Sequence, residues 1–152
     1  MLARDVGLLI LRLAGVGMAV YHGWGKLMAL STGQGAGFIA GVAALGFPVP
    51  VVFAWLAAIA ECLGGVLVAV GLGTRVAAAS VAGTMVVAAF LRHHAHGHLL
   101  HALGIAPVSD EVRKGWGNPE LALVYLLVFV AIALVGPGGL ALDARFGRKG
   151  RK

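Results

Sequence analysis

Three ionisable side chains, Arg12, His22 and Lys26, lie inside an apolar run of membrane-spanning length from Val6 to Leu30. At 100° per residue they fall on one helical arc with small residues, whereas the opposite arc carries Leu, Ile, Val and Met. An ionisable group at membrane depth costs on the order of 3 kcal/mol or more, and it therefore marks a candidate functional site. Groups of this kind exchange protons or bind polar ligands, and each needs a partner on another segment.

Glu61 is the predicted partner of Arg12. It lies at the centre of a second apolar run, on a face shared with Ala54, Ala57, Ala58, Gly64 and Gly65. Small residues let two helices approach closely, so opposite charges on such faces can meet. Two interpretations stay open: the pair sets the register of the helices, or Glu61 is a proton-exchanging carboxyl that Arg12 tunes.

His22 and Lys26 lie one helical turn apart, about 6 Å along the axis. Both lie toward the outward end of the first run, at the level expected for Glu120, so we expect Lys26 and Glu120 to form an outward polar floor. His22, beneath that floor, either makes a hydrogen bond in a helix interface or contacts a ligand, because imidazole donates to carbonyl oxygens and exchanges protons. Tyr125 is a further candidate for ligand contact.

Five of the six histidines lie between Arg92 and His101. If the preceding helix continues, His94, His98 and His101 share one face, an arrangement suited to Zn or Cu. Gly97 opposes a regular helix there. The segment is interpreted as a metal site, as a pH-sensitive interfacial segment or as one without a specific role; haem held by paired histidines is a further alternative, without a CxxCH motif.

The elements that position these residues are predicted to be membrane helices in a single domain, residues 1–152. The composition is 60% hydrophobic and 12% charged, which is typical of an integral membrane protein. We expect an all-α bundle of four transmembrane helices, with Asn118, Pro119 and Glu120 opening the last. A stretch that connects the first two helices and is too short to span, Phe38–Leu45, is expected to lie in the membrane interface or to re-enter the membrane shallowly. The predicted spans are 6–30, 51–72, 76–91 and 121–135.

The net charge of +6 is not gathered on a patch suited to nucleic acid, so nucleic-acid binding is not expected. The basic tail, residues 143–152, and the turn at Arg75 instead predict that both termini face the cytoplasm, beside anionic lipid. Cys62 is the only cysteine, which excludes an intramolecular disulfide. We expect no separate cleavable signal peptide, because the first apolar run is too long.

An ordered set of short motifs resembles the DoxX family of small four-helix bacterial membrane proteins. The motifs extend over nearly the whole chain: Leu11-Arg-Leu13, His22-Gly-Trp-Gly-Lys26, Leu45-Gly-Phe-Pro48, the central Glu61, Gly71-Leu-Gly-Thr-Arg75, the span opened by Glu120, Gly136-Pro-Gly138 and Leu142-Asp143. The resemblance implies a link to membrane redox processes, since a related subunit belongs to thiosulfate:quinone oxidoreductase. The histidine cluster departs from the family pattern.

Together, these features predict a redox-associated subunit of the bacterial inner membrane that binds a quinone or small redox partner. His22, Lys26, Glu61 and Glu120 would line the pocket, Arg12 is also counted among the ligand-binding residues, and Glu61 and His22 would be the proton-exchanging groups. Electrons would come from a redox protein partner, because the sequence has no redox cofactor motif, and the chain alone is not predicted to be a complete enzyme. Two alternative functions are a metal or small-molecule handling protein that uses the histidines and a scaffold for an extracytoplasmic enzyme. The alternative to a redox protein partner is a homo-oligomer.

Overall fold

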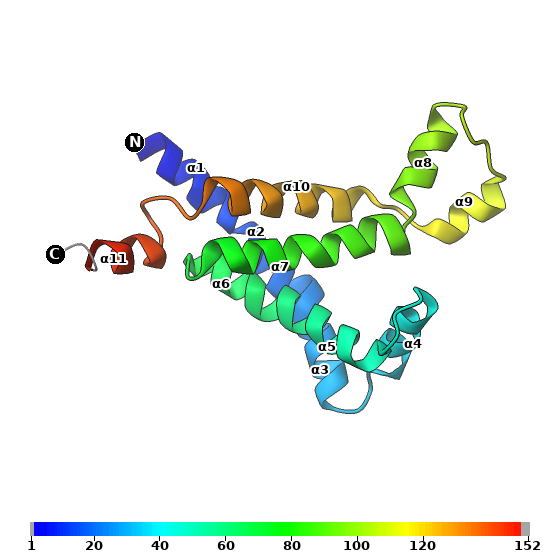
Figure 1. Ribbon diagram of the computed structural model, residues 1–152, viewed down its shortest axis with the longest axis horizontal. Helices are drawn as coiled ribbons and strands as arrows, with labels where there is room; N and C mark the ends of the chain where they lie inside the picture. Colours follow the sequence, from blue (N-terminus) through cyan, green and yellow to red (C-terminus); the bar gives the residue numbers. More distant parts are fainter. Residues whose placement is uncertain (1, 150–152) are drawn as a thin grey trace.

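The computed structural model describes the backbone from Leu2 to Lys149 and the side chains as far as Phe146. Every regular element in this part of the chain is helical (Figure 1). Three helices are long and apolar enough to cross a membrane: Leu2–Ser31, Pro50–Val70 and Thr74–Arg92. The prediction of an all-α membrane protein is confirmed.

Each of the three long helices contains one π-helical segment, in which the backbone hydrogen bonds reach one residue further than in an α-helix. The first helix comprises α1 (Leu2–Arg12), α2 (Ala14–Gly17), η1 (Met18–Gly23) and α3 (Trp24–Ser31). The second comprises α5 (Pro50–Ile59), η2 (Ala60–Gly64) and α6 (Gly65–Val70), and the third α7 (Thr74–Val86) and η3 (Val87–Arg92). Pro50 at the start of α5 lacks a backbone N–H and has a helical φ, so it suits the first turn.

The fourth predicted span is α10 (Glu120–Val135), which packs along α7. Its 16 residues cover about 24 Å, less than the ~30 Å of a bilayer core. It is long enough to cross a membrane only together with α9 (Asp110–Trp116), from which it is bent by 45°. The structure therefore supports three spans, or four if α9 and α10 act as one bent span.

Small residues bring the first two helices together. A Cβ built on Gly15 would collide with the carbonyl oxygen of Gly65, and one built on Gly65 would lie 2.6 Å from the carbonyl oxygen of Gly15. This close packing confirms that the predicted small-residue faces meet. The main apolar core lies beside this contact, where Met18 packs with buried residues of α7 and α10 such as Val81 and Phe129.

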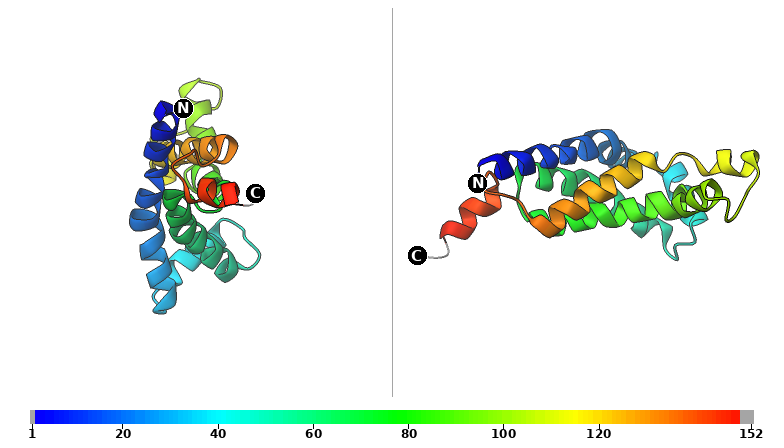
Figure 2. Two further views of the ribbon diagram at one scale, coloured as in Figure 1. Left: turned by 90° about the vertical axis from the view of Figure 1, so that its left-hand side faces the viewer. Right: turned by 90° about the horizontal axis from the view of Figure 1, so that it is seen from above.

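The shorter helices lie at the two ends of the bundle. The predicted interfacial segment is α4 (Ala36–Ala44), which packs on α5. At the end away from the N-terminus, α8 (Ala95–Ala102) and α9 project from the bundle (Figures 1 and 2). The start of α1 and α11 (Leu142–Lys149) lie at the opposite end (Figure 1). Residues 150–152 of the predicted basic tail fall outside the described chain.

Candidate intramembrane site

A buried ion pair joins the first two helices. Nζ of Lys26 in α3 donates a hydrogen bond to Oε2 of Glu61 in η2 at 2.6 Å. The Glu61 side chain is 3% exposed and that of Lys26 is 32% exposed. A carboxylate so deeply buried is stable only when paired, and a short charge-assisted hydrogen bond supplies that partner. The predicted pairing of Glu61 with Arg12 is therefore wrong.

The first two helices run antiparallel, and their alignment along the axes explains why Glu61 pairs with Lys26 and not with Arg12. A Cβ on Gly23 would collide with the backbone of Glu61 and Cys62, and one on Gly71 with the guanidinium of Arg12. Glu61 therefore lies level with Gly23, within one turn of Lys26, whereas Arg12 lies level with the far end of α6. The two π-helical segments η1 and η2 pack against each other at this level. Such segments occur frequently at functional sites.

His22 lies beside the ion pair and meets a residue of α10. Its ring packs edge-on against that of Tyr125, with 5.5 Å between the centroids and 79° between the planes. Within the described chain, neither ring nitrogen of His22 has a hydrogen-bond partner, so both remain available to a ligand. The hydroxyl of Tyr125 lies against Gly17, where a Cβ would be only 2.8 Å away.

These four side chains line a cavity of about 1140 Å³. Most of its wall is apolar and comes from α4, the second helix and α7, with Phe38, Leu56 and Val76 among the lining residues. Leu56 and Val76 are 56% and 76% exposed, so the cavity is a groove open to the surface that lipid would cover. An apolar groove with few convergent polar groups is the usual form of a small-molecule site. We call it the lateral groove.

Arg12 belongs to a separate polar cluster at the N-terminal end of the bundle. It is 1% exposed, and its Nη2 donates to the carbonyl oxygen of Leu140 at 2.9 Å. Its Nε and Nη1 have no hydrogen-bond partner among the described residues. Arg12 does not line the lateral groove, so its predicted role in ligand binding has no geometric support.

Asp143 is the acidic member of this cluster and caps α7. Its carboxylate accepts hydrogen bonds from the backbone N–H of Gly73 at 2.8 Å and from the N–H and hydroxyl of Thr74 at 2.9 and 2.8 Å. Burial raises the pKa of Asp143, but these bonds and the charge of Arg12 outweigh it, so the pKa lies below its usual range. The cluster ties α11 to the turn between α6 and α7.

Glu120 does not form the predicted outward floor with Lys26. It is exposed at the start of α10, where its backbone N–H donates to Oδ1 of Asn118 at 2.8 Å, and it does not line the lateral groove. Asn118 therefore caps α10, as predicted, and the negative charge of Glu120 is stabilising at the helix N-terminus. Lys26 is bonded to Glu61 instead.

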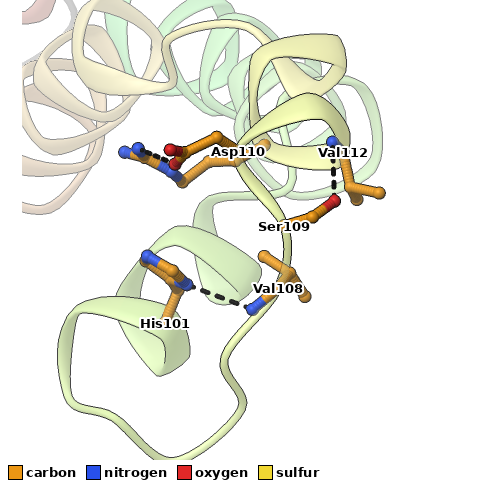
Figure 3. Close-up of polar contacts among 6 residues, drawn as sticks. His101, Val108, Ser109, Asp110 and Val112 are labelled. Carbon is orange, nitrogen blue, oxygen red and sulfur yellow. Dashed lines mark hydrogen bonds and ion pairs between the residues drawn. The ribbon is translucent and has the colours of Figure 1, made fainter.

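The predicted metal face of His94, His98 and His101 does not form. Residue His94 has φ 49°, so the backbone breaks before α8 and the three residues do not lie on one continuous helix. Instead, His98 Nε2 donates to the carbonyl oxygen of Gly117 at 2.9 Å. His101 Nδ1 accepts from the N–H of Val108 at 3.2 Å, as Figure 3 shows. Among residues 2–149, no three His, Cys, Asp or Glu side chains are grouped to hold a metal ion.

Comparison with known proteins agrees with this architecture. The chain is 30% identical over 143 residues to the inner membrane protein YphA of Escherichia coli K12, covering 94% of this chain and 92% of that protein. It is 30% identical over 146 residues to an uncharacterized protein of Haemophilus influenzae, covering 96% and 95%. No solved structure matches the chain significantly. The profile of the DoxX family matches residues 7–94. The chain therefore belongs to the DoxX family.

Proposed function

We propose that this chain is a redox-associated subunit of the bacterial inner membrane that binds a quinone, or another small redox partner, in the lateral groove. The observation that carries the proposal is the buried Lys26–Glu61 pair on the wall of an apolar groove of about 1140 Å³. A quinone has an apolar tail and two carbonyl oxygens, so it matches apolar walls with a few hydrogen-bond donors.

The polar groups would divide the chemistry between them. Lys26 has N–H donors beyond the one given to Glu61, and His22 is open at both ring nitrogens, so both can donate to a quinone carbonyl oxygen. Reduction of a quinone to a quinol takes up two electrons and two protons. Glu61 and His22 would exchange the protons, and a redox protein partner would supply the electrons.

The test is a binding titration with ubiquinone on the detergent-purified chain, together with extraction of any quinone that co-purifies. We expect Lys26→Met to weaken binding about tenfold, since it removes a hydrogen-bond donor to the quinone, and Glu61→Gln to weaken it by releasing Lys26 from its paired position. Glu120→Gln is the matched control, because it neutralises an exposed carboxylate outside the groove. Equal affinity for ubiquinone in the unmodified chain and in the three variants would refute the site.

The proposal includes an orientation with both termini in the cytoplasm. The start of α1 and α11 lie at one end of the bundle, and Arg75 is on the turn at that same end. Basic residues near membrane spans favour the cytoplasmic side. A reporter active only in the cytoplasm should work when fused after Lys152, and a periplasmic reporter should work at Gly115. The reverse pattern would invert the orientation.

A further inference from the structure

We infer that the lateral groove also binds an anionic phospholipid, whose phosphate is held at the end of the groove where Arg92 lies. This site uses other polar groups than the quinone proposal and does not depend on it. The groove extends from Gly73 to Arg92 along the third helix. The 19 residues of that helix span about 28 Å, close to the ~30 Å of a bilayer core.

The walls of the groove suit an acyl chain. One wall is formed by exposed apolar residues of the second helix, Leu56, Ile59 and Leu63, and the other by residues of the third, such as Val76. The volume of about 1140 Å³ exceeds the ~300–1000 Å³ typical of drug-sized ligands. The groove is therefore large enough to hold an acyl chain.

The charges at the Arg92 end point to an anionic head group. Arg92, His93 and Asn118 line the groove there, and Asn118 also lines an adjoining cavity of about 460 Å³ with Arg113 and Lys114. Glu61 is the only carboxylate that lines either cavity, and Lys26 already pairs with it.

The nearby acids do not cancel all of this positive charge. Arg113 is paired with Asp110 at 2.7 Å, and Oε2 of Glu120 accepts a hydrogen bond from Nδ2 of Asn118 at 3.5 Å at the rim. Arg92 and Lys114 have no ion-pair partner within the described chain and remain free for an anion.

Arg92 and Lys114 also have no other evident role. Basic residues are disfavoured on the outward side of a membrane protein, and the orientation proposed above puts both there. Neither donates a side-chain hydrogen bond to a described residue, in contrast to Arg75, which donates to the carbonyl oxygens of Ala133 and Leu134. An anionic head group at this end, where the two cavities share Asn118, would offer acceptors for charge-assisted hydrogen bonds to both side chains.

The test is native mass spectrometry of the detergent-purified full chain, titrated with phosphatidylglycerol or phosphatidylcholine. We expect the anionic lipid to bind about tenfold more tightly, and Arg92→Gln with Lys114→Gln to abolish that preference. The matched control, Arg4→Gln with Arg145→Gln, removes two exposed charges at the other end of the bundle and should retain it. Arg92→Lys with Lys114→Arg keeps both charges and should also retain the preference, which separates lost charge from misfolding.

Three results would overturn the inference. The first is equal binding of the two lipids. The second is binding of inorganic phosphate as tight as that of phosphatidylglycerol, which would assign the site to a free anion. The third is a lipid-free dimer, which would assign the groove to an interface between two copies of the chain. Loss of lipid preference with unchanged ubiquinone binding would leave the proposed function intact.

Discussion

Replacing Lys26 by methionine tests the ion pair most directly. The change keeps the length of the side chain but leaves Glu61, 3% exposed, without its partner. Breaking a buried pair by removing one member costs about 3–5 kcal/mol, because an uncompensated charge remains. Lys26→Met should therefore lower the free energy of unfolding by about 3–5 kcal/mol.

Glu61→Gln should cost less, because the orphaned Lys26 is 32% exposed and can turn its ammonium toward solvent. Its cost should be about 1–2 kcal/mol.

The assay is thermal unfolding of the detergent-solubilised variants at pH 7, with Glu120→Gln as the control for loss of an exposed carboxylate. Lys26→Met should have the lowest midpoint of the three variants. A Lys26→Met midpoint equal to or above that of Glu61→Gln would show that Glu61 is not a buried charge compensated by Lys26.

The positions of the helices could be predicted from the sequence because they are set by the lengths of the apolar runs and by the Gly and Pro residues that separate these runs. The second predicted span, 51–72, is observed as Pro50–Val70, and the third, 76–91, as Thr74–Arg92. The π-helical segments could not be predicted, because hydropathy does not distinguish one backbone hydrogen-bond register from another. The left-handed backbone conformation of His94 could not be predicted either, and it interrupts the helix on which the predicted metal face depended.

The candidate residues were predictable but the partner of Glu61 was not. Burial of charge at membrane depth identified Arg12, Lys26 and Glu61 as residues that need partners. Which of them meet depends on how two antiparallel helices are aligned along their axes, and the small-residue faces specify contact but not that alignment. That alignment follows from the close approach of Gly23 to Glu61 and Cys62, which puts Glu61 within one turn of Lys26 and leaves Arg12 beside Gly71, past the end of α6.

Three further predictions concern the packing around the site and the N-terminal polar cluster. Gly65→Leu should separate the first two helices and lower the unfolding midpoint far more than Gly41→Leu, since a Cβ at Gly41 meets nothing within 4 Å. Asp143→Ala should destabilise the protein at pH 7 through loss of the α7 cap. Because the folded-state pKa of Asp143 is lowered, that difference should be constant above about pH 4 and disappear as the pH falls further, as measured by paired thermal melts. Arg12→Met should cost less stability than a buried ion pair would, because Arg12 has one hydrogen bond, to Leu140, and two donors without a described partner. Its ubiquinone affinity should equal that of the unmodified chain, since Arg12 lies outside the lateral groove; a tenfold loss in a folded Arg12→Met protein would return Arg12 to the binding site and contradict the separation of the two polar clusters.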